Sequence, residues 1–200
     1  MNHYFDAQPQ SPSRPQAFAL TYRGAAFTFT SDAGVFSKGD LDAGTRLLLD
    51  ALPWPLSGRL YDLGCGWGAV GVIAGKLSPG LAVTMSDLNE RAVSLAAMNA
   101  RANGVAACAM AADGARGVDG RFDVITLNPP IRAGKDTVYR LFREARERLA
   151  PRGARYVVMR VKQGAPSALK YLATIFQSVE TVRRSGGYHV FCCKEARDAI

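Results

Sequence analysis

The chain has 200 residues, of which 48% are hydrophobic, and its formal net charge is +8. This length suits one domain with a sizeable core, and no apolar stretch approaches the roughly 20 residues of a membrane span. The composition therefore excludes a helical membrane protein. The polar, proline-rich N-terminus lacks the apolar centre of a secretory signal, so we expect a cytoplasmic protein.

The cysteines and histidines argue against a metal centre. Histidine occurs only at His3 and His189, and the four cysteines form no CxxC pair. This pattern is typical neither of a disulfide framework nor of a zinc site. We expect buried, reduced thiols at all four cysteines, which are Cys65, Cys108, Cys192 and Cys193.

The positive charge is unevenly distributed along the chain. Residues 1–130 carry 10 basic and 11 acidic side chains, whereas residues 131–200 carry 15 basic and 6 acidic ones. A lopsided basic surface favours a polyanionic partner such as RNA or DNA, but a solvated surface without a partner can have the same composition. Charge alone leaves both alternatives open.

The first 58 residues predict a leader followed by a small β extension. Residues 1–16 are rich in Pro, Gln and Ser and predict a disordered leader. Residues 17–34 contain two β-like runs around Arg23-Gly24, which predict a hairpin. Residues 36–54 predict a loop that leads into a short helix, which the following prolines stop.

From Arg59 onward, strand-like runs alternate with helical ones. Strands are predicted at 59–66, 81–87, 106–113, 122–128 and 154–161, with a closing hairpin at 178–194, and helices at 68–77, 89–104, 136–153 and 166–177. We expect Gly104 to stop the second of these helices, Asp136 to cap the third, and Pro151 and Gly153 to end it.

This alternation predicts an α/β fold. We expect a Rossmann-like, seven-stranded, mostly parallel sheet with helices on both faces, an antiparallel C-terminal hairpin and a small N-terminal β-hairpin extension. Residues 17–200 would form one domain, with the hairpin and a cap at 17–58 and the core at 59–200.

The stretch "YDLGCGWGAVG" places Gly64, Gly66 and Gly68 between a strand and a helix. Glycines there allow a tight turn and a close approach of the backbone to a ligand. Asp62 precedes the first glycine, and Asp87 ends the next strand, 19 residues after Gly68. A carboxylate at the second position typically receives ribose hydroxyls. The alternative is a tight turn with surface acids.

The acid before the glycines disfavours a dinucleotide, because a pyrophosphate needs unopposed backbone N–H groups. S-adenosylmethionine carries an ammonium, a sulfonium and a ribose, and no phosphate. We therefore expect this cofactor, with Asp62 facing its amino-acid end and Asp87 its ribose. Asp113 follows the third strand, where its carboxylate can accept from the adenine amine. An exposed loop acid is the alternative there.

Asn128 ends the fourth strand and is followed by Pro129 and Pro130. In an open α/β sheet, ligands bind beyond the carboxyl ends of the strands near the switch point in strand order, which places Asn128 beside the glycine turn. Its amide oxygen and a neighbouring carbonyl could hold a planar amino group, and the prolines stiffen the corner. Methyl transfer from a sulfonium then needs mainly positioning. A proline-stopped strand with a capping Asn is the alternative.

Together these residues resemble the class I S-adenosylmethionine-dependent methyltransferases, and in particular the "methyltransferase small" domain family. This family includes the guanine-N2 methyltransferases of the type named ribosomal RNA small subunit methyltransferase C and their single-domain relatives. The resemblance runs from about Ala17 to Lys194. The residues that carry it are Phe36-Ser37-Lys38-Gly39, Leu41-Asp42-Ala43-Gly44-Thr45, Asp62-Leu63-Gly64-Cys65-Gly66-Trp67-Gly68, Asp87-Leu88-Asn89 and Asn128-Pro129-Pro130-Ile131.

The resemblance implies a role for each site residue. Asp62, Gly64, Gly66, Asp87, Leu88, Asp113 and Asn128 would bind the cofactor, and Asn128 with Pro129 and Pro130 would hold the target amine. The segment from Phe36 to Thr45 would cover the cofactor. Many relatives have an aromatic residue after Asn-Pro-Pro, and Ile131 stacks less well on a base.

We therefore expect an N-methyltransferase acting on an exocyclic amine, most specifically guanine N2 in ribosomal RNA or a pre-ribosomal particle. The base would leave its stack to reach Asn128, with Ile131, Arg132 and Lys135 as substrate contacts. A basic helix bearing Arg140, Arg143 and Arg146 could contact phosphates, or could be a solvated face. The alternatives are another amine (adenine N6 in DNA, a protein glutamine or a small molecule), a non-catalytic RNA-binding module, and, more distantly, a nicotinamide oxidoreductase.

Overall fold

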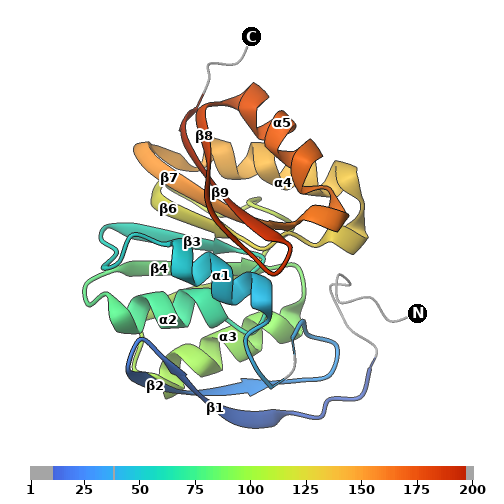
Figure 1. Cartoon of the computed structure of the whole chain (residues 1–200). Helices are drawn as coiled ribbons and strands as arrows, with labels where there is room; N and C mark the ends of the chain where they lie inside the picture. The colour runs from blue at the N-terminus through green and yellow to red at the C-terminus, as the bar shows by residue number, and fades with distance from the viewer. Residues whose placement is uncertain (1–10, 38, 197–200) are drawn as a thin grey trace.

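The structure is a computed structural model and describes residues 11–37 and 39–196. Its main sheet has seven strands in the order β5-β4-β3-β6-β7-β9-β8 (Figure 1). These strands are β3 (Arg59–Leu63), β4 (Ala82–Asp87), β5 (Ala107–Ala111), β6 (Phe122–Leu127), β7 (Leu149–Arg160), β8 (Phe176–Ser185) and β9 (Tyr188–Ala196). Strand β9 runs opposite to the other six strands, which share one direction, so the predicted mostly parallel sheet is confirmed.

Helices cover both faces of this sheet, as predicted. Three helices pack into the hydrophobic core on one face and two into the core on the other. They are α1 (Ala43–Ala51), α2 (Ala69–Leu77) and α3 (Glu90–Ala102) on the first face, and α4 (Lys135–Glu147) and α5 (Ala165–Ile175) on the second; two short 3-10 turns are η1 (Ile131–Ala133) and η2 (Val161–Gln163). No helix in the described part of the chain is long and apolar enough to cross a membrane.

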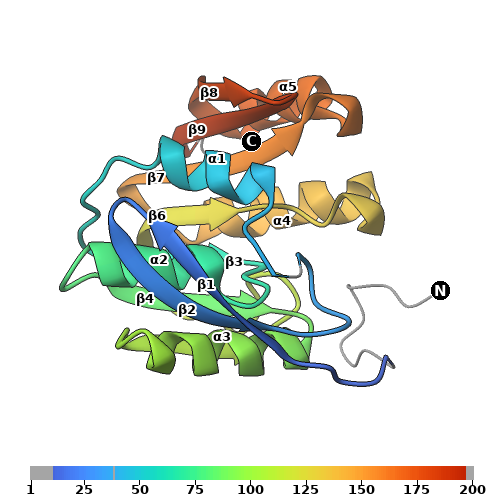
Figure 2. The same cartoon turned by 60° about the horizontal axis from the view of Figure 1, so that its bottom comes forward.

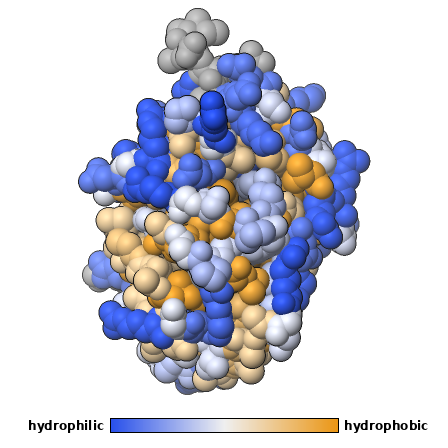
Figure 3. Space-filling view, turned by 90° about the vertical axis from the view of Figure 1, so that its left-hand side faces the viewer, coloured by the Kyte–Doolittle hydropathy of each residue, from blue (hydrophilic) through white to orange (hydrophobic). Residues whose placement is uncertain are grey.

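Strand β3 lies at the switch point of the sheet. It pairs in parallel with β4 on one side and with β6 on the other, and Leu63 is in register with both Ser86 and Leu127. The carboxyl ends of three strands therefore meet at one edge. Figure 2 shows the segment between β2 and α1 running past this edge. Figure 3 views the opposite side, where hydrophobic residues form separate patches among hydrophilic ones.

The N-terminal hairpin is also confirmed. Strands β1 (Gln16–Tyr22) and β2 (Ala25–Ser31) pair in antiparallel register and form a separate sheet beside α3. Of the predicted leader, residues 1–10 lie outside the described residues. In the part that follows, the hydroxyl of Ser13 and the backbone N–H of Arg14 donate to Asp32. Lys38 of the expected cover and residues 197–200 also lie outside the described residues.

Three local expectations were wrong. Helix α4 begins at Lys135 with Gly134 as its N-cap, so Asp136 lies in the first turn and does not cap it. The same helix ends at Glu147, and Pro151 and Gly153 belong to β7, because the sheet extends further toward its amino end than the apolar run indicates. Cys108 is exposed, since β5 is an edge strand.

The C-terminal hairpin inserts its last strand into the sheet. Strand β9 lies between β7 and β8, pairing with both, and the turn is Gly186-Gly187. Arg160 at the end of β7 is in register with Tyr188 at the start of β9. The turn of the hairpin therefore lies at the same edge as the carboxyl ends of β3, β4 and β6.

Candidate active site

The glycine turn connects β3 to α2 with a backbone that favours glycine. Gly64, Gly66 and Gly68 have φ of +71°, +55° and +89°. No heavy atom lies within 4 Å of a Cβ built on Gly64 or Gly66, so a side chain there would enter open space at the turn. A Cβ on Gly68 would instead lie 3.0 Å from Ala96 of α3. The first two glycines leave room for a ligand, and the third lets two helices pack closely.

Asp62 joins the elements that meet at the switch point. It is 3% exposed, and its carboxylate accepts from the backbone N–H of Gly71 at 3.1 Å and from the Thr126 hydroxyl at 2.9 Å. Burial raises the pKa of Asp62 to about 6, and these two hydrogen bonds oppose the shift. A cation entering the cavity would favour the charged form of this carboxyl group.

Asp87 fastens the glycine turn to the end of β4. Its carboxylate accepts from the backbone N–H groups of Gly66 and Asn89, both at 2.9 Å. Burial raises the pKa of Asp87 too. Leu88, next along the chain, is 38% exposed and offers an apolar surface to the cavity. An acid beside an apolar contact suits a nucleoside, whose ribose is polar and whose base is flat.

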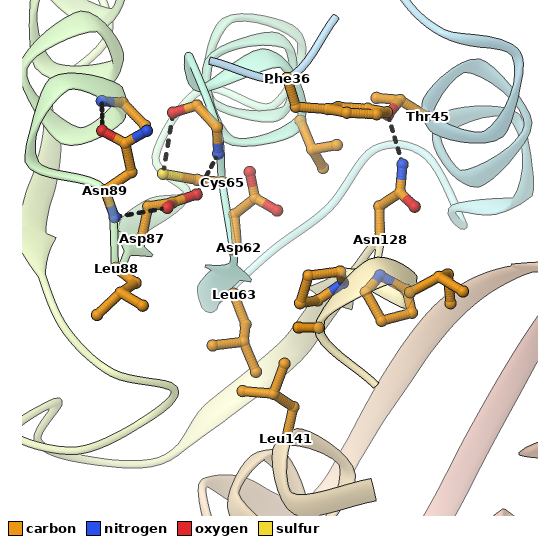
Figure 4. A pocket seen from close by; sticks show the side chains of 18 of the residues that line it. Phe36, Thr45, Asp62, Leu63, Cys65, Asp87, Leu88, Asn89, Asn128 and Leu141 are labelled. Atoms are coloured by element: carbon orange, nitrogen blue, oxygen red, sulfur yellow. Dashed lines mark hydrogen bonds between the residues drawn. The ribbon is translucent and has the colours of Figure 1, made fainter. Parts of the chain in front are cut away.

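Asn128 directly follows β6, and Figure 4 shows Asp62 between Asn128 on one side and Asp87 on the other. Its Nδ2 donates to the Thr45 hydroxyl at 3.1 Å. Pro129 is buried, and Pro130 leads into η1, which begins at Ile131. The two prolines supply carbonyls but no backbone donors, so acceptors dominate this corner.

The segment between β2 and α1 is tied to the glycine turn. The indole Nε1 of Trp67 donates to the carbonyl of Ser37 at 2.9 Å, and Asn89 Nδ2 donates to the carbonyl of Gly34 at 2.9 Å. Phe36 is 49% exposed and lines the cavity with Thr45. Figure 4 shows both above Asn128. The residues expected to cover the cofactor thus border the same space as those expected to bind it.

Asp62, Asp87, Asn128 and the first two glycines of the turn line one cavity of about 840 Å³. It brings together eleven predicted site residues, which are Asp62, Gly64, Gly66, Asp87, Leu88, Asp113, Asn128, Pro129, Pro130, Ile131 and Arg132. Lys135 does not line it, and its ammonium lies over the ring of Tyr139, 5.2 Å from the centroid. Cys65 also lines the cavity, and burial raises the pKa of its thiol well above the usual value.

Asp113 is already engaged in two ion pairs. Its carboxylate oxygens lie 2.6 Å from Arg140 and 3.1 Å from Arg116. Arg140 also binds Glu144 at 2.8 Å, and these hydrogen bonds raise the pKa of the Arg140 guanidinium. A hydrogen bond from an adenine amine to Asp113 would therefore share the carboxylate with Arg140.

Residues beyond the motifs also line the cavity. Arg140 comes from α4, whereas Arg160, Gln163 and Tyr188 come from the end of β7, from η2 and from the start of β9. The guanidinium of Arg160 lies 5.6 Å from the centroid of the Tyr188 ring. No local pattern indicated Arg160, Gln163 or Tyr188, because it is the pairing of β9 with β7 that brings Tyr188 beside Arg160 at the cavity. Arg140 was already expected on the basic helix as a candidate phosphate contact.

The chemistry of the cavity fits S-adenosylmethionine. Asp62 and Asp87 flank the glycine turn with negative charge, which suits an ammonium and a ribose and opposes a pyrophosphate. The open space at Gly64 and Gly66 would admit the ligand close to the backbone. A Rossmann-like sheet with this turn after its first strand and Asn-Pro-Pro after its fourth defines a class I S-adenosylmethionine-dependent methyltransferase.

Comparison with known proteins defines the family. The methyltransferase small domain matches residues 26–192. YbxB of Bacillus subtilis (strain 168) is 39% identical over 96% of this chain and 98% of its own length. Ribosomal RNA small subunit methyltransferase C of Pseudoalteromonas atlantica is 34% identical over 84% of this chain and 50% of its own length. The chain belongs to the methyltransferase small domain family.

A solved structure adds a ligand-bound relative. The T. thermophilus 16S rRNA N2 methyltransferase (RsmC), in complex with AdoMet and guanosine, superposes with a TM-score of 0.82 at 28% identity. The match covers 92% of this chain and 51% of that one. The chain thus spans about half the length of these methyltransferase C relatives.

Proposed function

We propose that the protein transfers a methyl group from S-adenosylmethionine to the exocyclic N2 amine of guanine in ribosomal RNA. The observation that carries the proposal is the position of Asn128. It lies in the same cavity as the acid-flanked glycine turn, at the end of the strand next to β3. The relatives that act on ribosomal RNA, one with AdoMet and guanosine bound, support the same substrate.

The residues of the chain would act mainly by positioning. S-adenosylmethionine supplies an activated methyl group on its sulfonium. Asp62 and Asp87 would hold the ammonium and ribose, while Asn128 Oδ1 and the carbonyl of Pro129 would accept hydrogen bonds from the target amine. These acceptors would favour positive charge developing on the nitrogen as its bond to the methyl forms and the bond between that methyl and the sulfonium sulfur breaks, which would leave S-adenosylhomocysteine. The amine then loses a proton to solvent. Pro130 stiffens the corner, and Ile131 and Phe36 would offer apolar contact to the base.

The basic surface supports a nucleic acid, although the arginines of α4 also bond within the protein. Arg143 donates to the Tyr171 hydroxyl and Arg146 to the carbonyl of Ile175, and Arg155 is fully buried between two phenylalanine rings. Other exposed cations lie at or near the carboxyl edge of the sheet. Arg132 and Arg160 line the cavity, Lys162 follows in η2, and Arg183 and Arg184 lie near the end of β8. We propose that these five residues, the basic edge, contact phosphates.

The direct test is labelled methyl transfer onto total RNA, followed by nucleoside analysis. Wild type should yield N2-methylguanosine. Asn128→Ala should lower kcat by about 100-fold or more, because an acceptor for the reacting nitrogen is lost, while calorimetry still detects S-adenosylmethionine binding. If wild type labels no RNA, DNA, protein or small molecule, a non-catalytic RNA-binding module is the better account.

Two further features belong to the proposal. The reaction would take place in the cytoplasm, on ribosomal RNA or a pre-ribosomal particle, as the ribosomal RNA relatives suggest. Residues 17–58 would serve as a hairpin and cap for the core at 59–200. The contact of Trp67 with Ser37 supports that role. If the labelled methyl group is found on adenine N6, on a protein glutamine or on a small molecule, the proposed reaction stands but the proposed substrate is wrong.

A further inference from the structure

An amide side chain can present either its oxygen or its NH₂ group to a substrate, and only its hydrogen-bond partners decide which. Asn128 Nδ2 donates to the Thr45 hydroxyl at 3.1 Å. Among the described residues, no group donates to Asn128 Oδ1. A hydrogen bond that holds Asn128 Nδ2 at Thr45 therefore leaves Asn128 Oδ1 available to accept from a substrate amine.

Asp42 controls the direction of that hydrogen bond. The hydroxyl of Thr45 donates to Asp42 Oδ2. Asp42 Oδ1 accepts from the backbone N–H groups of Gly44 at 2.9 Å and Thr45 at 3.3 Å. A carboxylate that accepts these bonds donates none, and a hydroxyl has one proton. With its proton committed to Asp42, Thr45 Oγ1 can only accept from Asn128.

Both ends of this chain of hydrogen bonds are held by regular structure. Asp42 is the N-cap of α1, Thr45 is in the first turn of that helix and 6% exposed, and Asn128 ends β6. Thr45 and Asn128 are 83 residues apart in sequence. Figure 4 shows the hydrogen bond between them at the rim of the cavity. Helix α1 thus reaches a site residue of the Rossmann-like core.

We infer that Asp42 and Thr45 are positioning residues, which hold the amide of Asn128 so that Oδ1 faces the target amine. The inference rests on the proposed function, because the orientation matters to a rate only if an amine is the substrate. If the amide were inverted, the NH₂ group of Asn128 would face the N–H groups of the substrate amine, and two donors cannot form a hydrogen bond. The reacting nitrogen would then lose its acceptor and its alignment with the methyl donor.

The first comparison is Thr45→Val against Thr45→Ser. Valine matches the shape of threonine without the hydroxyl, and serine keeps the hydroxyl. We expect Thr45→Val to lower kcat for RNA methylation by about 10- to 100-fold and Thr45→Ser to restore it to within about threefold of wild type. The Kd for S-adenosylmethionine and the thermal midpoint, measured on the same samples, separate this effect from a loss of cofactor binding or of folding.

The second variant, Asp42→Asn, reverses the chain of hydrogen bonds. Asparagine is an equally good N-cap, so α1 should be retained. With Oδ1 still capping the helix, its NH₂ group would donate to Thr45 Oγ1. The Thr45 proton would then be free to donate to Asn128 and invert its amide. We expect a lower kcat with a thermal midpoint close to that of wild type. A changed Kd for S-adenosylmethionine with unchanged kcat would instead assign Asp42 to the cofactor.

A double-mutant cycle tests whether Thr45 acts through Asn128. In an Asn128→Ala background, Thr45→Val should cause no further loss of the residual rate, whereas a purely structural role would add its own cost. Wild-type kcat in Thr45→Val, or additive losses, would overturn the inference. If wild type methylates nothing, the proposed function fails, and NMR still tests the orientation. In wild type, the Asn128 side-chain NH₂ should exchange its hydrogens slowly. In Thr45→Val, this protection should be lost and exchange should be faster.

Discussion

Asp62 accepts from the backbone N–H of Gly71 in α2 and Asp87 from that of Gly66 in the glycine turn, and both residues line the cavity. Their position in the motif predicted that they would face the ammonium and the ribose of the cofactor, which stays a prediction, but it did not predict how deeply Asp62 is buried. Burial raises the pKa of both carboxyl groups, that of Asp62 to about 6. The ligand-free protein therefore bears two acids whose negative charge is poorly solvated, and an ammonium would relieve this cost.

The raised pKa of Asp62 predicts how cofactor binding depends on pH. Between about pH 4 and 6 the folded protein holds more protons at Asp62 than the unfolded chain, so stability from this group falls as pH rises through that window. If Asp62 faces the cofactor ammonium, as proposed, the cofactor would bind the ionised form of Asp62 more tightly than the neutral form. We expect its affinity to fall by up to about tenfold per unit as pH drops below about 6. Calorimetry at several pH values measures this.

Asp62→Asn is the control for that measurement. We expect weaker binding at pH 7.5 and a shallower pH dependence, to which Asp87, whose pKa is also raised, would still contribute. An unchanged slope in this variant would assign the titration to another group.

At the scale of secondary-structure elements, side chains of α3 and its C-cap form hydrogen bonds with the backbone of the N-terminal hairpin. Asn99 and Asn103 lie one helical turn apart, and each exchanges two hydrogen bonds with the backbone of β2, at Thr30 and Thr28. Asn99 also donates to the carbonyl of Trp67 in the glycine turn at 2.8 Å. The hairpin and the cofactor site are therefore joined through one side chain.

Two alanine substitutions should separate the contacts that hold the hairpin from the contact that links it to the glycine turn. Asn103→Ala removes contacts to the hairpin and should lower the free energy of unfolding by about 1 kcal/mol, because Thr28 is exposed and water can replace the amide. Asn99→Ala also strands the buried Trp67 carbonyl and should cost about 2 kcal/mol and weaken S-adenosylmethionine binding. Urea unfolding and calorimetry check both. Equal cofactor affinity in the two variants would contradict the link.

For the whole molecule, the arrangement of charge matters more than its total. The positive excess of residues 131–200 includes a buried arginine and three on α4 that bond within the protein. The basic edge remains exposed, and two of its residues, Arg132 and Arg160, line the cavity. Under the proposed function, this edge would meet the RNA and the acids beside the glycine turn would meet the cofactor, so the two ends of the cavity would differ in sign.

Charge reversal tests that separation. Arg183→Glu with Arg184→Glu should weaken RNA binding by about tenfold or more at moderate salt and reduce the steepness of its salt dependence, because fewer counterions are released. The control pair, Arg152→Glu with Lys170→Glu, changes the net charge equally at exposed positions that do not belong to the basic edge, near the start of β7 and on α5, and should have a smaller effect. Equal losses would show that only net charge matters.

Periodicity and turn residues in the sequence determined most of the fold by themselves. Apolar runs of strand and helix length alternate from Arg59, and parallel strands bring their carboxyl ends to one edge. The spacing of Asp62, Asp87 and Asn128 was therefore enough to expect them in one cavity. The errors at Asp136, Pro151 and Cys108 arose where an N-cap, a strand's extent or an edge position depends on neighbouring elements.

Only the tertiary structure decided which distant side chains complete the cavity. The insertion of β9 between β7 and β8 brings Arg160 and Tyr188 to the substrate end, and the packing of α1 places Thr45 against Asn128. Such contacts depend on how elements far apart in sequence pack together. Local propensity carries no information about that packing. A motif at the carboxyl end of a parallel strand, in contrast, must lie at one known edge of the sheet.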